Sequence, residues 1–217
     1  MNFRIARTIA GCSDAIIEHI LDLENNSIFN TLIVSPPNSG KTTILKDLVR
    51  QISSGIKKQK FKGINVGVID ERGEIASLYK GVPQNDIGIK IDVIDNISKS
   101  KGIQMMIRSM APQVIVADEI GAAKDIDAIN YSITSGCKGI FTAHGNEIND
   151  LYMSPIIKEL MISNIFEIII FLDVKEKGKI KDVYKMDKKN FEYKRFEKID
   201  ETANEINIIF GDEIWLF

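Results

Sequence analysis

The sequence predicts a three-layer α/β/α domain built on a mostly parallel central sheet. Between residues 31 and 173, apolar runs of strand length alternate with amphipathic stretches of helix length. The apolar runs show little alternation with polar residues, which is typical of strands that helices cover on both faces. Repeated strand–helix units at this spacing favour parallel strands connected through helices.

The expected elements follow one another regularly. Strands are expected at 31–35, 64–70, 89–95, 113–117, 139–143 and 166–173. Helices are expected at 41–52, 102–110, 125–135 and 154–163, after a strand or arm at 2–10 and a helix at 13–23. We therefore divide the chain into a lead-in arm and helix (1–30), a core (31–173) and a C-terminal hairpin extension (174–217).

The composition excludes several classes of protein. The 217 residues include 28 Lys and Arg against 30 Asp and Glu, a net charge of −2, so no nucleic-acid partner is expected. Cys12 and Cys137 stand far apart, which excludes a structural zinc site and argues against a disulfide framework. No apolar run approaches the roughly 20 residues of a membrane-crossing helix. The N-terminus lacks the apolar segment of a signal peptide, so we expect a cytoplasmic protein without a direct membrane span.

A phosphate-binding loop is the strongest functional signal. Residues 35–42, SPPNSGKT, stand between an expected strand and an expected helix. Backbone N–H groups at a helix N-terminus attract phosphate oxygens, and Gly40 leaves room for their approach. Lys41 would contact the β- and γ-phosphates and Thr42 would ligate Mg²⁺.

The loop departs from the common pattern GxxxxGK[ST] at its start. Ser35 replaces the first glycine, and the two prolines that follow it have no N–H to donate. Binding is therefore expected to rest on the amides from Asn38 onward. The predicted nucleotide-binding residues are Pro37, Asn38, Ser39, Gly40, Lys41, Thr42 and Thr43.

Two carboxylates follow the expected strand at 113–117. In a parallel sheet this strand end lies at the same edge as the phosphate loop. Asp118 is expected to hold Mg²⁺, directly or through water, and Glu119 to orient or deprotonate the attacking water. Together the two motifs predict a nucleoside triphosphatase that uses Mg²⁺ and ATP, although no base-reading residue distinguishes ATP from GTP.

Two further polar clusters follow strands at the same expected edge. The segment 68–74, VIDERGE, follows the second strand, and the segment 142–145, TAHG, follows the strand at 139–143. A single histidine after a strand is commonly a surface or capping residue. Beside two catalytic motifs, however, His144 is placed to form a hydrogen bond with the γ-phosphate that hydrolysis would break.

The extension is basic. Residues 175–200 hold ten Lys or Arg and six Asp or Glu, with Gly178 between two strand-like pieces. A solvated β-hairpin explains this pattern, and so does an interaction surface for a partner or an anionic lipid.

The four motifs together resemble those of a known superfamily. A phosphate loop, an acidic box (IDERGEI, residues 69–75), an IRSMAPQVIVADEIG segment and a TAHG box, in this order, resemble the secretion and type IV pilus ATPases. SPPNSGKTT, DERGEIA, GIQMMIRSMAPQVIVADEIG and GIFTAHG also resemble the stage III sporulation protein AA family of endospore-forming Firmicutes. The SPP start of the loop is similar to that family's own form, and the likeness runs from about residue 2 to residue 173.

The resemblance implies a RecA-like P-loop fold and a biological role. It implies an ATPase of a channel between mother cell and forespore, assembled as a homo-oligomeric ring, expected to be a hexamer. This ATPase would lie at the cytoplasmic face of the mother-cell membrane, with a channel or platform protein of the sporulation secretion complex as partner. Members of the family carry a further N-terminal domain, which we expect to be absent here.

The resemblance also implies roles for individual residues. Lys41 and Thr42 match the Walker A motif, and Asp118 and Glu119 match Walker B. The carboxylate of the acidic box matches Glu71, and the His-box position matches His144. Arg72 and Arg108 are the arginines nearest these motifs, and each is either an arginine finger for a neighbouring subunit or part of a structural salt bridge.

Two other functions are consistent with the same motifs. A DNA-handling motor would need a basic channel bearing aromatic residues, which the net charge does not favour. A nucleotide-binding scaffold with little turnover would use the extension as its docking surface.

Overall fold

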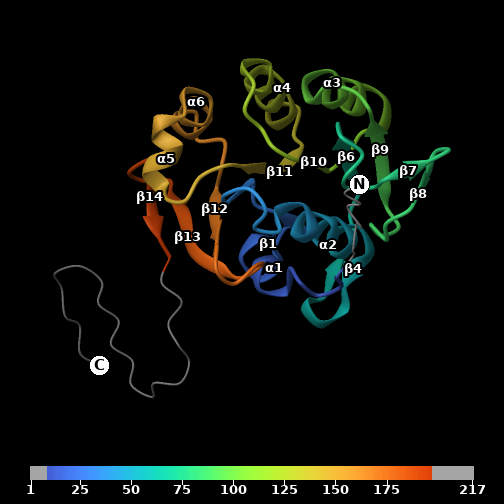
Figure 1. Cartoon of the computed structure of the whole chain (residues 1–217), viewed down its shortest axis with the longest axis horizontal. Coiled ribbons are helices and arrows are strands. Elements are labelled where there is room, and N and C mark those ends of the chain that lie inside the picture. The colour runs from blue at the N-terminus through green and yellow to red at the C-terminus, as the bar shows by residue number, and fades with distance from the viewer. Residues whose placement is uncertain (1–8, 197–217) are drawn as a thin grey trace, which may run out of the picture.

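A single eight-stranded sheet forms the centre of the computed structural model, which describes residues 9–196 (Figure 1). Its strand order is β14-β13-β12-β3-β11-β10-β6-β9, in which the strands from β12 to β9 are parallel and β13 and β14 are antiparallel. The strands are β3 (Thr31–Val34), β6 (Val66–Asp70), β9 (Ile91–Asp95), β10 (Val114–Ala117), β11 (Lys138–Ala143), β12 (Ile168–Leu172), β13 (Ile180–Asp187) and β14 (Glu192–Arg195).

Helices cover both faces of this sheet. Helices α1 and α2 lie on one face, and α3, α4, α5 and α6 lie on the other (Figure 1). Their bounds are α1 Asp14–Ile20, α2 Lys41–Ser54, α3 Lys99–Met110, α4 Ala123–Thr134, α5 Ile148–Met153 and α6 Pro155–Ile162. The predicted RecA-like class, three layers around a mostly parallel sheet, is confirmed.

Short elements complete the described chain. They are the strand pairs β1 (Leu21–Asp22) with β2 (Ser27–Ile28), β4 (Gly55–Ile56) with β5 (Phe61–Lys62) and β7 (Leu78–Tyr79) with β8 (Val82–Pro83), and the 3-10 turn η1 (Lys57–Gln59). None of the helices within residues 9–196 has both the length and the apolar character that a membrane crossing requires.

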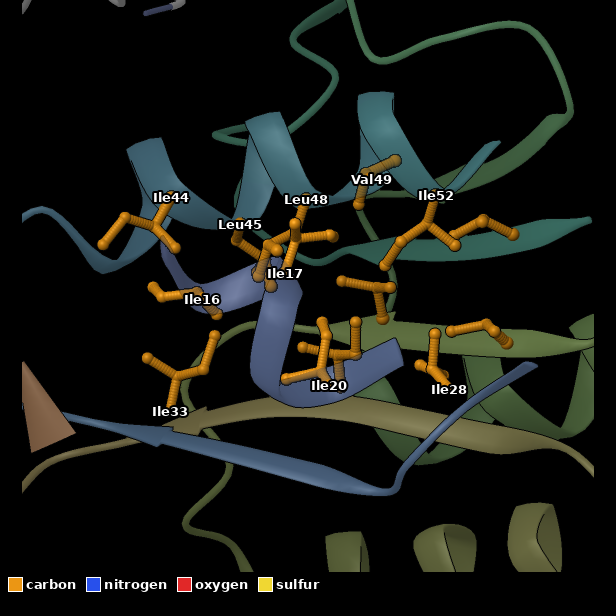
Figure 2. Close-up of a cluster of buried hydrophobic side chains, with 14 of the residues drawn as sticks. Ile16, Ile17, Ile20, Ile28, Ile33, Ile44, Leu45, Leu48, Val49 and Ile52 are labelled. Carbon is orange, nitrogen blue, oxygen red and sulfur yellow. The ribbon is translucent and has the colours of Figure 1, made fainter. Parts of the chain in front are cut away.

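The two faces of the sheet have separate hydrophobic cores. Strand β3 shows why its residues alternate little in polarity: Ile33 belongs to one core, while Leu32 and Val34 belong to the other. On the first face α1 packs against α2 (Figure 2). Burial of each isoleucine or leucine side chain contributes roughly 1.5–3 kcal/mol to the free energy of folding. The contacts shown there involve Ile16, Ile17, Ile20, Ile44, Leu45, Leu48, Val49 and Ile52.

The expected elements and the observed ones differ in two helical regions. The expected helix at 13–23 ends at Ile20, because the chain turns there into the β1–β2 pair. The expected helix at 154–163 is preceded by a separate helix, α5, and Ser154 divides the two by accepting the backbone N–H of Ile157 at the start of α6. The predicted arm at 2–10 lies, up to residue 8, outside the described residues.

The described part of the extension continues the central sheet. Strand β13 pairs with β12 and β14 pairs with β13, so Gly178 lies in the turn before β13 and the expected hairpin turns later, after Asp187. Val183 joins the first core, and Tyr184 and Tyr193 pack against the second. Residues 197–217 lie outside the description, and the division into 1–30, 31–173 and 174–217 stays a prediction.

The fold brings the polar motifs to one edge of the sheet. Strand β11 lies between β3 and β10, with Ala143 beside Val34 and Phe141 beside Ala117. Ala117 also pairs with Ile69 of β6. The phosphate loop, the two carboxylates after β10, the TAHG segment and the acidic box therefore all leave the sheet at its carboxyl edge, where ligands bind in open α/β sheets.

Candidate active site

The phosphate loop curls over the N-terminus of α2. Gly40 is the N-cap of α2 and has φ of 94°, a conformation that side chains other than glycine rarely allow. Asn38 also has positive φ, at 63°. A cleft of about 670 Å³ opens here, lined by Pro37, Asn38, Ser39, Gly40, Lys41, Thr42, Thr43, Arg72, Glu74, Glu119, His144 and Lys177.

Lys41 is held inside the loop. The residue is 6% exposed, and its Nζ donates to the carbonyl oxygens of Ser35 at 2.8 Å and Pro36 at 3.1 Å. Nδ1 of His144 lies 3.2 Å from the same Nζ. Burial lowers the pKa of Lys41, and the nearby carboxylates of Asp118 and Glu119 oppose this shift.

A hydrogen bond joins Thr42 to Asp118. The Thr42 hydroxyl donates to Asp118 Oδ2 at 2.8 Å, although the two residues are 76 positions apart. Within residues 9–196 no group of three or more His, Cys, Asp or Glu could hold a metal ion unaided. One hydroxyl and one carboxylate nevertheless fit Mg²⁺, which uses few protein ligands when phosphate oxygens supply others.

Glu119 faces both the cleft and a smaller adjoining pocket. Its backbone is left-handed, with φ of 52°, and its N–H donates to the hydroxyl of Thr142 at 2.8 Å. Its carboxylate contacts two side chains: Oε2 lies 2.6 Å from Nη1 of Arg72, and Oε1 lies 3.4 Å from Nε2 of His144. The side chain that we expect to activate water is thus held by an ion pair with Arg72 and a contact with His144.

The acidic box divides into structural and cleft-facing carboxylates. Asp70 is buried and accepts the backbone N–H groups of Glu74 and Ala76, each at 2.8 Å, which ties the loop after β6 together. Glu71 pairs with Lys99 of α3 and lines the smaller pocket together with Asp118 and Glu119. Glu71 is not among the described residues that line the larger cleft, whereas Glu74 lines both.

The two candidate arginines occupy different places. Arg72 pairs with Glu119 of its own chain and lines both cavities. Arg108 is exposed in the last turn of α3 and is not among the described residues lining either cavity.

Sequence reasoning missed three residues that contact the site. Glu74 stands in the acidic box and Thr142 in the TAHG segment, so both were within motifs that had been singled out. Lys177 enters the cleft from the turn after β12, because β12 pairs in parallel with β3 and so ends at the same edge as the phosphate loop. No local pattern around Lys177 could have indicated this contact.

The chain is similar to known sequences over most of its length. The model of the family described as "Sporulation stage III, protein AA" matches residues 1–191. "Stage III sporulation protein AA" of Bacillus subtilis (strain 168) is 40% identical over 187 residues, which are 86% of this chain and 59% of that protein. The chain thus spans less than two thirds of the length of this relative.

Solved structures share the fold. The Legionella pneumophila ATPase DotB superposes with a TM-score of 0.59 at 17% identity, covering 86% of this chain and 54% of that one. The VirB11 ATPase of the Brucella suis type IV secretion system, solved in complex with sulphate, gives a TM-score of 0.50 at 14% identity, with 78% and 50% covered. The family match over residues 1–191 is decisive, and the chain belongs to the sporulation stage III protein AA family.

Proposed function

We propose that this chain binds ATP with Mg²⁺ at the carboxyl edge of its sheet and hydrolyses it as the motor of a secretion-type channel. The observation that carries the proposal is the hydrogen bond between Thr42 and Asp118 at 2.8 Å. It joins the phosphate loop to the carboxylates after β10, which is the pairing that a shared metal–triphosphate site requires.

Binding would use the loop and the start of α2. Phosphate oxygens would replace the carbonyls of Ser35 and Pro36 as acceptors for the Lys41 ammonium. Because Pro36 and Pro37 have no N–H, the amides from Asn38 onward and the N-terminus of α2 would supply the remaining donors. Thr42 and Asp118 would hold Mg²⁺, which neutralises charge on the phosphates when it is bound.

Hydrolysis would use Glu119. Its carboxylate would accept a proton from water as the water oxygen attacks the γ-phosphorus and the bond to the bridging β–γ oxygen breaks, giving ADP and phosphate. His144 lies between Lys41 and Glu119 and would bond to the γ-phosphate, so its contacts change on hydrolysis. Glu71, oriented by Lys99, would assist from the adjoining pocket.

Turnover would depend on assembly. Arg72 forms an ion pair with Glu119 of its own chain. A neighbouring subunit that attracts Arg72 would break this ion pair and leave the Glu119 carboxylate available for catalysis. Arg108 is exposed and therefore available to reach a neighbour's site as an arginine finger. We propose a homo-oligomeric ring, expected to be a hexamer, and a partner that is a channel or platform protein of the sporulation complex. The ring would act in the mother cell at the cytoplasmic face of the membrane.

The Glu119→Gln variant tests the catalytic assignment. Gln keeps the size of the side chain but accepts no proton, so phosphate release should fall at least about hundredfold while ATP binding persists. Phosphate release and equilibrium binding of a fluorescent ATP analogue measure the two properties. Glu24→Gln makes the same chemical change at an exposed position in the β1–β2 turn and should behave as wild type. Normal turnover by Glu119→Gln would remove Glu119 from the mechanism.

A further inference from the structure

Thr142 stands at the centre of the site without an assigned role. It lies near the end of β11, the strand between β3, which leads into the phosphate loop, and β10, which leads to Asp118. Its side chain is fully buried, so its hydroxyl has no access to water. A buried hydroxyl must find its partners within the protein, and here both partners belong to the proposed catalytic machinery.

The hydroxyl makes two hydrogen bonds of opposite sense. It donates its proton to Asp118 Oδ1, and it accepts the backbone N–H of Glu119 at 2.8 Å. With Oδ1 occupied in this way, Asp118 Oδ2 is the oxygen that faces the Thr42 hydroxyl. Thr142, on the neighbouring strand, therefore determines which Asp118 oxygen, Oδ2, is left to face Thr42 and the proposed metal position.

The second bond supports an unusual backbone. Glu119 has φ of 52°, and non-glycine residues keep such conformations only where the surroundings enforce them. The Thr142 hydroxyl anchors the Glu119 N–H from one side, and the N–H of Ile120 donates to the carbonyl of Thr142 at 2.8 Å. This anchoring directs the Glu119 carboxylate into the cleft.

We propose that Thr142 is a positioning residue that aligns Asp118 toward Mg²⁺ and Glu119 toward the attacking water, an inference that rests on the proposed function. The role needs one small group that donates and accepts at once, as a hydroxyl does. Without that hydroxyl, the remaining bond between the two groups is the one from the Glu119 N–H to Asp118 Oδ1, at 3.1 Å. Asp118 Oδ1 would then lose its hydroxyl donor, and the backbone N–H of Glu119 would lose its shorter bond.

Two matched pairs of side chains isolate the hydroxyl. Thr142→Val preserves the shape of threonine and replaces the hydroxyl with a methyl group, whereas Thr142→Ser and Thr142→Ala differ from each other by the hydroxyl alone. The control is Thr31→Val, at another fully buried threonine, at the amino end of β3, whose hydroxyl donates to the carbonyl of Phe29 at 2.8 Å. This control measures how much the loss of a buried hydroxyl outside the site lowers stability and changes Mg²⁺ dependence.

The readout is the Mg²⁺ concentration that half-saturates binding of a fluorescent ATP analogue, measured together with phosphate release. For Thr142→Val and Thr142→Ala this concentration should rise about tenfold, and turnover at saturating Mg²⁺ should fall about tenfold or more, because buried groups lose a partner. Thr142→Ser and Thr31→Val should keep the wild-type Mg²⁺ dependence, even if Thr31→Val unfolds at a lower temperature.

The outcomes separate the two proposals. Wild-type Mg²⁺ dependence in Thr142→Val, in a protein that hydrolyses ATP and loses activity in Lys41→Ala, overturns the role of Thr142 alone. If Thr142→Val does not fold, equal Mg²⁺ dependence of Thr142→Ser and Thr142→Ala overturns it in the same way. A wild-type chain that neither binds nor hydrolyses ATP overturns the proposed function and this inference with it.

Discussion

The inner and outer parts of the candidate site are built differently. The inner part, defined here as Lys41, Asp118 and Thr142, lies among backbone and side-chain hydrogen bonds, and Lys41 is only 6% exposed. The outer part, defined as Arg72 and His144 around Glu119, consists of the Arg72–Glu119 ion pair and the contact between His144 and Glu119, and the Arg72 side chain is 65% exposed. Exposed pairs contribute only about 0–1 kcal/mol and are screened by salt.

This difference separates a fixed binding site from exchangeable contacts. The inner hydrogen bonds are costly to break because Lys41 and Thr142 are buried, so little water can replace a lost partner. The outer contacts exchange readily for a phosphate or for a charge on a neighbouring subunit. We therefore expect nucleotide binding to be a property of the single chain and turnover to respond to assembly.

The largest effect is expected in the inner part. Lys41→Ala removes the buried ammonium that would face the β- and γ-phosphates, so affinity for a fluorescent ATP analogue should fall at least about hundredfold. Lys58→Ala, in the exposed 3-10 turn, removes a lysine without touching the cleft and should bind as wild type. Retained affinity in Lys41→Ala would show that the inner part is not the nucleotide site.

The buried hydrogen-bond network of Asp47, on α2, lies outside the candidate site. It serves as a comparison, because breaking it should affect stability but not turnover. Asp47 of α2 accepts the N–H and the hydroxyl of Ser13, and it also accepts bonds from Arg50 and Gln51. Asp47→Asn should lower the free energy of unfolding at pH 7 by about 1–3 kcal/mol and leave the turnover of the folded protein unchanged. Denaturant unfolding and phosphate release measure the two properties, and a large loss of turnover would contradict the separation.

The same carboxylate predicts a pH dependence. Burial would raise the pKa of Asp47, but hydrogen bonds from Ser13, Arg50 and Gln51 outweigh it and hold the pKa below the usual 3.8. Its stabilising contribution is therefore present above pH 3.8 and is lost as the pH falls through the lower pKa of the folded state. The difference in unfolding free energy between wild type and Asp47→Asn should shrink in that acidic range. A constant difference from pH 7 downward would contradict the shift.

The smallest effect on stability is expected in the outer part. Arg72→Ala removes an exposed partner of Glu119, so the free energy of unfolding should change by less than about 1 kcal/mol. The salt dependence of turnover should weaken, because one screened ion pair is gone. Phosphate release measured from low to high ionic strength checks this, and an unchanged salt dependence would remove Arg72 from the control of Glu119.

The sequence predicts the layers of the fold better than it predicts the pairing of the outer strands and the boundaries of the helices. The non-alternating apolar runs place the strands of the parallel sheet, because burial on both faces leaves a local signature. The pairing of β13 with β12 leaves no such signature, and the charged residues around it also fit a separate hairpin. Helix α5 lies before the expected helix at 154–163, and its boundary with α6 depends on one cap, at Ser154.

The candidate site was predictable at the level of motifs but not of contacts. Phosphate-loop and carboxylate motifs identify Lys41 and Asp118 because the chemistry restricts the residue types. The partner of Glu71, Lys99, lies on another element, and the bond from Thr142 crosses between strands. Such contacts depend on strand order and register, which a single sequence does not specify.

The central claim is that the phosphate loop and the carboxylates after β10 act on one triphosphate. Its most direct test is Mg²⁺-dependent phosphate release from ATP by wild type and Lys41→Ala, with sedimentation run on the same samples. The account predicts release by wild type that increases with the assembled fraction and release by Lys41→Ala at background. Equal release by both proteins at equal assembly would contradict it.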